Sequence, residues 1–64
     1  MGLNIKIARI RKGLTQKQLA EQIGASRISI TGLESGKFLN PTLRTLKKIA
    51  KALDVSISEL LDGE

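Results

Sequence analysis

Cysteine, histidine, tryptophan and tyrosine are absent from this chain of 64 residues, which contains one phenylalanine and one proline. Without cysteine, the chain has no disulfide and no thiolate to offer a metal. Without histidine, it lacks the commonest general base and the usual nitrogen ligand of zinc. The six carboxylates follow no spacing that would assemble a catalytic pocket. We therefore expect neither an enzyme nor a site for a metal or cofactor.

Long apolar runs are missing as well. No segment approaches the roughly 20 apolar residues that cross a membrane, and the N-terminal residues lack the apolar region of a secretory signal. These features predict a cytoplasmic protein with no membrane partner and no evident small-molecule ligand. A chain this short makes one domain over residues 1–64 and buries only about 60% of its unfolded surface, so dimerisation would add stability.

Acidic residues are few and lie mostly at the C-terminal end. Up to Leu53 the chain has eleven Lys and Arg against two acids, a formal charge of +9, whereas from Asp54 onward it has four acids and no base. The whole chain carries +5. A basic body with an acidic end favours contact with a polyanion on one side of the molecule. The same charge would also serve solubility alone.

The chain does contain a succession of apolar residues at helical spacing, separated by capping residues. The pattern predicts five helices and no strand, at about residues 3–12, 16–23, 27–35, 41–53 and 57–61. The first helix has an apolar stripe of Leu3, Ile7 and Ile10, which Ile5 and Ala8 widen, and we expect this side to face the core. Short loops favour a compact all-α bundle of five helices.

Capping residues predict where the later helices begin. Thr15 and Gln18 have the spacing of a capping box at the start of the second helix. Asn40 is expected to cap the fourth helix, with Pro41 in its first position, where a missing N–H does no harm. Ser56 is expected to cap the last helix. The expected buried stripe of the fourth helix consists of Leu43, Leu46, Ile49, Ala50 and Leu53.

Residues 16–35 form the most informative segment. Apolar residues stand at helical spacing on both sides of a break, at Leu19, Ile23, Ile30 and Leu33. At the break, Gly24 can adopt the positive φ that ends one helix, and Ser26 can cap the next. Two short helices that cross steeply at such a turn can present the second one to the DNA major groove.

These residues resemble the Cro/repressor helix-turn-helix family, which includes phage repressors and the controller proteins of restriction-modification systems. The resemblance is carried by GLTQ at 13–16, LAE at 19–21, GASR at 24–27, LESG at 33–36, NP at 40–41, IAKAL at 49–53, VS at 55–56 and ELL at 59–61. This ordered set covers nearly the whole chain. It implies a lambda-repressor-like DNA-binding domain with the helix-turn-helix in the second and third helices.

The resemblance implies that the third helix enters the major groove and that its first exposed residues read base edges. Those residues are Ser26, Arg27 and Ile28, with Gly32 one turn later. Arg27 suits guanine O6 and N7, although an arginine here could instead hold phosphate or stay solvated. Ile28 lies outside the buried stripe and suits a thymine methyl; alternatively it completes the core or meets a protein partner. Gly32 either lets the backbone approach the groove or makes no contact.

Phosphate contacts are expected from Thr15, Gln16, Ser29, Thr31 and Lys37. The start of the second helix offers free N–H groups and the positive end of the helix dipole. In similar proteins the first Gln of this helix contacts DNA, which here is Gln16. Such contacts position a protein on DNA and carry no sequence information. Each of these side chains taken alone could equally be an ordinary solvated one.

Two further groups have structural roles. The resemblance implies an ion pair between Arg9 and Glu34, which would fix the first helix against the third. Four apolar residues form the candidate dimer interface: Phe38, Leu39, Ile57 and Leu61. Alternatively, the first two of these residues seal the core.

Together these features predict a sequence-specific regulator of transcription that binds double-stranded DNA and resembles a repressor. A homodimer would place the third helix of each protomer in the major groove of a near-palindromic operator. The alternative is a protein-interaction module of the same fold, such as an antitoxin or anti-repressor component.

Overall fold

The part of the chain that the structure describes folds into five helices, and the first three of them end at glycines. The computed structural model describes residues 1–38 and 41–61. Its helices are α1 (Gly2–Lys12), α2 (Gln16–Ile23), α3 (Arg27–Ser35), α4 (Leu43–Leu53) and α5 (Ile57–Leu61). Gly13, Gly24 and Gly36 have φ of 78°, 71° and 82°, a left-handed conformation that costs energy for residues with a Cβ. The all-α, five-helix prediction is confirmed, and so are the bounds of α2, α3 and α5.

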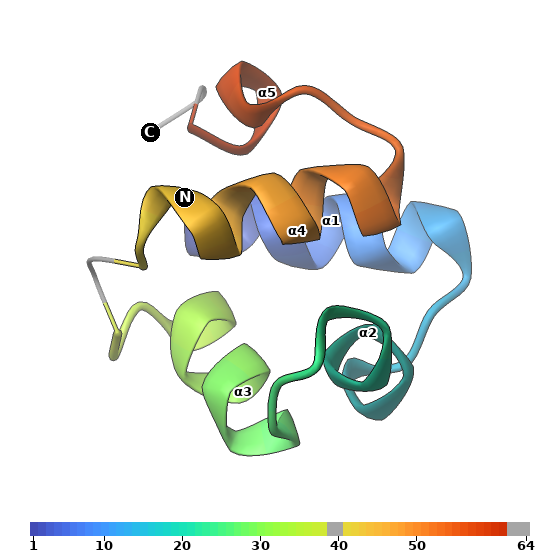
Figure 1. Cartoon of the computed structure of the whole chain (residues 1–64), viewed down its shortest axis with the longest axis vertical. Helices are drawn as coiled ribbons and strands as arrows, with labels where there is room; N and C mark the ends of the chain where they lie inside the picture. Colours follow the sequence, from blue (N-terminus) through green and yellow to red (C-terminus); the bar gives the residue numbers. More distant parts are fainter. Residues whose placement is uncertain (39–40, 62–64) are drawn as a thin grey trace.

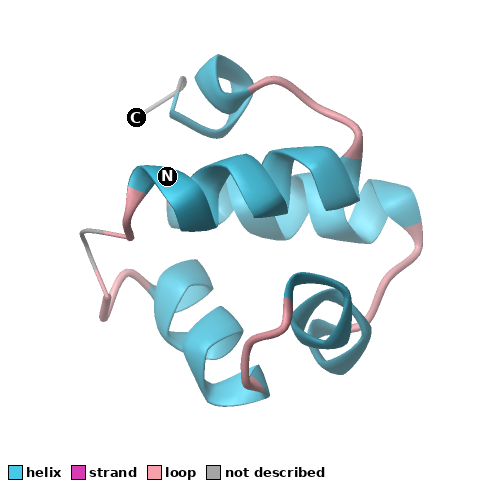
Figure 2. Cartoon of the chain, in the orientation of Figure 1, coloured by secondary structure: helices cyan, strands magenta, loops and turns pink. Residues whose placement is uncertain are grey.

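The helices lie in a simple arrangement around α1 and α4. These two helices occupy the middle of the molecule, with α5 on one side and α2 and α3 on the other (Figure 1). Figure 2 shows that short loops join the helices. Within residues 1–38 and 41–61, no helix is long and apolar enough to cross a membrane.

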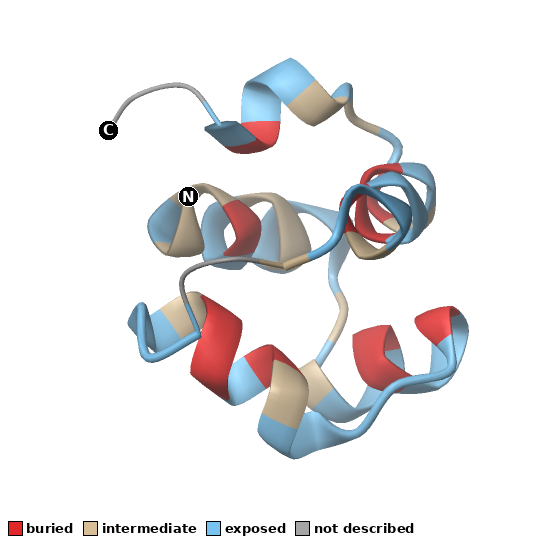
Figure 3. Ribbon diagram, turned by 60° about the vertical axis from the view of Figure 1, so that its left-hand side comes forward, coloured by how far each residue is buried: buried red, intermediate tan, exposed pale blue. Residues whose placement is uncertain are grey.

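One hydrophobic core joins all five helices. Each helix contributes one fully buried large side chain: Ile5, Leu19, Ile30, Ile49 and Leu60. Smaller buried residues, among them Ala20 of α2 and Ala50 of α4, let the helix backbones approach each other closely. The buried segments of the ribbons face the centre of the molecule (Figure 3). The helix-turn-helix is therefore attached to the rest of the protein through a shared core.

The stripe of Leu3, Ile7 and Ile10 on α1 faces solvent, whereas the sequence predicts that it faces the core. The exposed fractions of its three members are 65% for Leu3, 38% for Ile7 and 57% for Ile10. Instead, α1 packs through the side that carries Ile5, which is fully buried. The reason is geometric, because residues four apart share one face of a helix. Burying Ile5 therefore also turns Arg9 toward α3, where its partner Glu34 lies.

The start of α4 also differs from the prediction. The helix begins at Leu43, and its cap is Thr42, whose Oγ1 accepts a hydrogen bond from the N–H of Thr45 at 3.2 Å. Pro41 therefore precedes the helix, and Asn40 lies outside the described residues. Leu43 occupies the first helical position and is exposed, so it is not part of the buried stripe. Thr42, two residues after Asn40, is also of a type that caps helices, and the helix begins directly after it.

The capping box predicted at the start of α2 is present. The Oγ1 of Thr15 accepts from the N–H of Gln18 at 3.0 Å, and the Oε1 of Gln18 accepts from the N–H of Thr15 at 2.8 Å. Ser26 and Ser56 cap α3 and α5 by accepting from the N–H three residues further on, both at 3.2 Å. Side chains thus satisfy backbone donors that have no acceptor inside their own helices.

Replacing Thr15 with alanine should lower the free energy of unfolding by about 1 kcal/mol, because the N–H of Gln18 then loses its acceptor. Urea unfolding followed by circular dichroism measures this change. Lys17→Ala is the matched control in the same helix and should change stability by less than about 0.5 kcal/mol. Equal stability of the Thr15→Ala variant and the parent would show that the capping box contributes nothing.

Candidate nucleic-acid interface

The outer face of α3 is exposed to solvent along its first two turns. Ile30 and Leu33 are buried against the other helices, which fixes the rotation of α3 about its axis. Arg27, Ile28 and Thr31 consequently point outward, and the side chain of Ile28 is 75% exposed. An isoleucine this exposed contributes nothing to the core, so the alternative that Ile28 completes the core is wrong.

Ser26, the residue that caps α3, contacts Ser29 in the first turn of the helix. Ser26 and Ser29 lie with their Oγ atoms 3.1 Å apart, and the Oγ of Ser26 also accepts from the N–H of Ser29. Ser26 is exposed and Ser29 is half-buried. Ser26 therefore acts first as the helix cap, and any contact with DNA would come from the same hydroxyl.

An ion pair joins α1 to the end of α3. The Nε of Arg9 donates to Glu34 Oε2 at 2.6 Å, and its Nη2 donates to Oε1 at 3.1 Å. This is the two-pronged geometry in which an arginine fork matches a carboxylate. The side chains are 11% and 4% exposed, so little water screens the pair. The Nη1 of Arg9 also donates to the carbonyl oxygen of Leu14 at 2.8 Å, which holds the loop that leads into α2.

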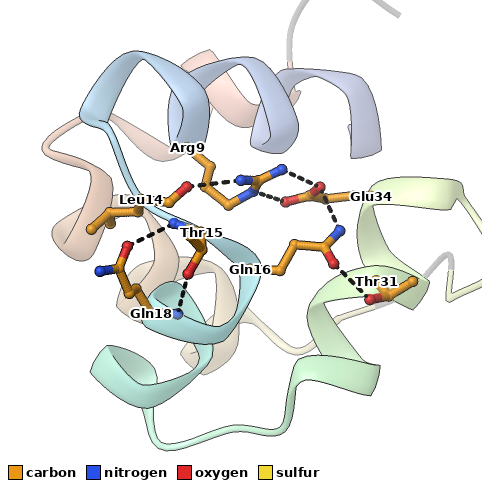
Figure 4. A network of polar contacts seen from close by, with 7 residues as sticks. All are labelled: Arg9, Leu14, Thr15, Gln16, Gln18, Thr31 and Glu34. Atoms are coloured by element: carbon orange, nitrogen blue, oxygen red, sulfur yellow. Dashed lines mark hydrogen bonds and ion pairs between the residues drawn. The ribbon is translucent and has the colours of Figure 1, made fainter.

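The ion pair extends through Gln16 to the outer face of α3 (Figure 4). The Nε2 of Gln16 donates to Glu34 Oε1 at 3.1 Å, and its Oε1 accepts from the hydroxyl of Thr31 at 3.0 Å. The carboxylate accepts hydrogen bonds only, so it fixes which end of the amide faces it. Two residues of α3 therefore hold Gln16, the first residue of α2. One of them, Glu34, is itself held by Arg9 of α1. Sequence reasoning named Gln16 and Thr31 separately and missed the bond between them.

The N-terminal end of α2 lies next to this network. Its capping box satisfies the N–H groups of Thr15 and Gln18. The N–H groups of Gln16 and Lys17 belong to the first turn, where helix geometry provides no acceptor. The helix dipole adds partial positive charge at the same end. This end of α2 can therefore hold an anion beside the exposed face of α3.

Gly32 is not exposed, contrary to the expectation from the sequence. The ring of Phe38 covers it, and a Cβ built on Gly32 would lie 2.2 Å from Cδ2 of that ring. The N–H of Phe38 also donates to the carbonyl oxygen of Gly32 at 3.0 Å, which fixes the loop against the helix. The backbone of Gly32 therefore lies behind this ring, and a contact between Gly32 and DNA stays a prediction. Phe38 occupies the space where a side chain at position 32 would lie.

The three described residues of the candidate dimer interface lie on two different elements. Phe38 packs on α3, whereas Ile57 and Leu61 belong to α5, which lies across α1 and α4 from α3 (Figure 1). Ile57 is half-buried against the core, and Leu61 is exposed. Leu39 lies outside the described residues. Lys37, expected at a phosphate, is exposed beside Phe38.

Sequence reasoning assigned Phe38 to a dimer interface or to sealing the core and missed its contact with Gly32. The structure makes it part of the outer face of α3, in a pocket that it shares with Arg27, Ile28 and Thr31. A signal for this position exists in the sequence, because a glycine inside a helix costs about 1 kcal/mol and calls for a reason. The only aromatic residue follows six positions later, and its ring supplies that reason.

Comparison with known proteins identifies the family. Residues 5–60 match the helix-turn-helix family. The chain is 48% identical over 66 residues to the HTH-type transcriptional activator BcrR of Enterococcus faecalis, covering 100% of this chain and 32% of that protein. It is 36% identical over 62 residues to the HTH-type transcriptional regulator SinR of Bacillus subtilis (strain 168), covering 97% of this chain and 56% of that protein.

Solved structures agree with this result. A crystal structure of SinR, the master regulator for biofilm formation, in complex with DNA superimposes with a TM-score of 0.90 at 36% identity, covering 95% of this chain and 97% of that one. The N-terminal DNA-binding domain of SinR from Bacillus subtilis gives the same TM-score, 0.90, at 35% identity, covering 98% of this chain and 91% of that one. The present chain spans about a third of BcrR and just over half of SinR. The chain belongs to the helix-turn-helix family, as its sequence predicts.

Proposed function

We propose that this chain is a sequence-specific DNA-binding module of a transcriptional regulator, in which α3 enters the major groove of double-stranded DNA. The observation that carries the proposal is the exposure of Arg27, Ile28 and Thr31 on α3 while Ile30 and Leu33 are buried. A helix about 10 Å wide fits the major groove of B-DNA, which is about 12 Å wide. The similarity to SinR, whose structure contains DNA, supports the same function.

Base recognition in this proposal belongs to the start of α3. Arg27 is exposed at the first helical position, where its fork can reach guanine O6 and N7. Ser26 and Ile28 flank it on either side. The acid of α3, Glu34, is 4% exposed and paired with Arg9, so it presents little negative charge to a phosphate backbone. The exposed face of α3 is therefore compatible with a polyanion.

Phosphate contacts in this proposal come from the end of α2 and from the edges of α3. Gln16 has a second amide hydrogen beyond the one that it donates to Glu34, and it stands next to the first-turn N–H groups of α2. Thr15, Ser29 and Lys37 complete the set, and Thr31 would join it by turning its hydroxyl hydrogen from Gln16 to a phosphate oxygen. Because both side-chain partners of Gln16, Glu34 and Thr31, belong to α3, the phosphate contact of Gln16 and base reading by α3 are set in one arrangement.

A homodimer on DNA follows from the size of one module. A single α3 reads only a few base pairs, whereas two copies related by a twofold axis would place their α3 helices about 34 Å apart, one turn of DNA. The exposed side chains of Leu43 and Leu61 are candidate contacts between protomers. Such a regulator would act in the cytoplasm, the compartment that contains the DNA in a cell without a nucleus.

Selection of bound duplexes from a random pool tests the function. We expect an inverted repeat with half-sites one helical turn apart, and binding to it should weaken as salt rises. In a plot of the logarithm of the association constant against the logarithm of salt concentration, the slope should be negative. Each phosphate contacted should add about 0.9 to its magnitude. Fluorescence anisotropy from low to physiological salt measures this slope. Failure to enrich any duplex, or affinity independent of salt, would contradict the proposal.

The exposed apolar pair Ile28 and Phe38 also suits a second function, in which the same fold binds a protein. A protein-interaction module would bury this pair against an apolar surface of its partner. The salt titration distinguishes the two functions, since a module of this kind would not bind random or selected duplexes.

A further inference from the structure

The outer face of α3 contains an apolar surface built from two separate segments of the chain. Ile28 and Gly32 lie four residues apart and so on the same face of the helix. The Phe38 ring covers Gly32 from the following loop, and Ile28 and Phe38 line one pocket of about 310 Å³. Phe38 is held there by the bond from its N–H to the carbonyl oxygen of Gly32. The isoleucine and the ring together form a preformed apolar surface.

The polar groups around this surface are largely occupied inside the protein. The hydroxyl of Thr31 donates to Gln16, and the hydroxyl of Ser35 donates to the carbonyl oxygen of Gly32 at 3.2 Å. Two charged side chains border the surface, Arg27 and Lys37, and both are basic. The surface is thus apolar in the middle and positive at its edges. This combination suits the floor of a DNA groove between two phosphate backbones.

We propose that Ile28 and Phe38 read the 5-methyl groups of thymines in the half-site, a proposal that rests on the function proposed above. The thymine methyl is the apolar feature of the major-groove edge and distinguishes T·A from the other base pairs. Phe38 supplies from the loop the contact that the missing side chain of Gly32 cannot make. Phe38 is therefore a residue that determines specificity, and Gly32 is a positioning residue that acts by leaving room for the ring.

Deoxyuridine substitution tests this proposal directly, because deoxyuridine lacks only the 5-methyl group of thymidine. Starting from a selected duplex, each thymine of one half-site is replaced in turn, and affinity is measured by fluorescence anisotropy at fixed salt. We expect the affinity to fall about fourfold at each of one or two positions, the effect of burying one methyl-sized group. At the other thymines the affinity should not change.

Variants of the protein assign each methyl to its reader. Ile28→Ala should abolish the loss of affinity that deoxyuridine causes at one thymine. Phe38→Ala should abolish this loss either at the other sensitive thymine or at the same one. Gly32→Ala should behave like Phe38→Ala, because its new Cβ displaces the ring. Leu3→Ala is the matched control, since it also removes an exposed apolar side chain, but from α1. It should keep the full sensitivity of the parent.

Each outcome of this experiment has a separate meaning. If the parent protein selects no duplex at all, the proposed function fails. If it selects a duplex but tolerates deoxyuridine at every position, DNA binding stands and methyl reading is wrong. If Phe38→Ala and Gly32→Ala both keep the sensitivity of the parent, Phe38 does not determine specificity. Circular dichroism of each variant confirms that it is folded before its affinity is compared.

Discussion

Replacing Glu34 with alanine is expected to lower the free energy of unfolding by about 3 kcal/mol. The change leaves the guanidinium of Arg9, which is 11% exposed, without its carboxylate partner. It also removes the acceptor that orients Gln16. A protein of this size has a total stability of roughly 3–10 kcal/mol, so the variant should keep only about 0–7 kcal/mol. Chemical denaturation followed by circular dichroism measures the loss.

Two comparisons separate the ion pair from a general effect of charge. Glu21→Ala removes an exposed acid from α2 and should change stability by less than about 0.5 kcal/mol. The double variant Arg9→Met/Glu34→Leu removes both charges, so it should be more stable than Glu34→Ala alone. Both variants that lack Glu34 should bind DNA less tightly, since Gln16 loses one of its two side-chain hydrogen bonds. A Glu34→Ala protein that melts like the parent would refute the coupling between α1, α2 and α3.

The second large effect concerns recognition. Arg27→Ala should weaken binding to the selected duplex by about tenfold to a hundredfold, the effect of losing one bidentate contact with guanine. It should leave the fold intact, because Arg27 is exposed. Affinity for random duplex should fall much less. The ratio of the two affinities, measured at one salt concentration, is therefore the informative quantity.

Arg11→Ala is the matched control for the loss of one positive charge. Arg11 is exposed on α1 and lines a pocket with residues of α4 and α5, whereas Arg27 is exposed on α3. Its removal should change the affinities for selected and random duplex by the same small factor. If Arg27→Ala behaved in the same way, Arg27 would be a phosphate contact only, the alternative that its sequence position left open.

Local signals in the sequence predict most of the fold. The capping box at Thr15, the cap at Ser26 and the glycines after α1, α2 and α3 each act within a few residues, so they can be recognised without knowing the tertiary structure. Ile30 and Leu33 fix which side of α3 is buried, and this in turn exposes Arg27 and Ile28. The core of the candidate site was therefore predictable.

The errors arise where two local solutions compete. α1 has apolar residues on two sides, and the structure buries the side with Ile5, which also brings Arg9 to Glu34 of α3. Near α4, both Asn40 and Thr42 could cap a helix, and the structure has Thr42 in that role. Neither choice can be read from spacing alone, because both depend on contacts between helices.

The contact of Phe38 with Gly32 depends on tertiary structure rather than on helical spacing. A loop residue can cover Gly32 only after the chain has turned back at the end of α3, and no periodic pattern records that turn. The bond between Gln16 and Thr31 is of the same kind, since it joins residues of two helices whose crossing the sequence does not specify. Both features complete the exposed face that the sequence indicated only in part.

Guanine analogues in the selected half-site provide the most direct measurement of whether the outward face of α3 lies in the major groove. 7-Deazaguanine lacks the N7 acceptor on the major-groove edge, whereas inosine lacks the N2 amino group on the minor-groove edge. The parent protein should lose about tenfold in affinity on 7-deazaguanine at one guanine, and Arg27→Ala should lose nothing further there. Undiminished affinity for every 7-deazaguanine duplex, together with a loss on inosine, would contradict the account.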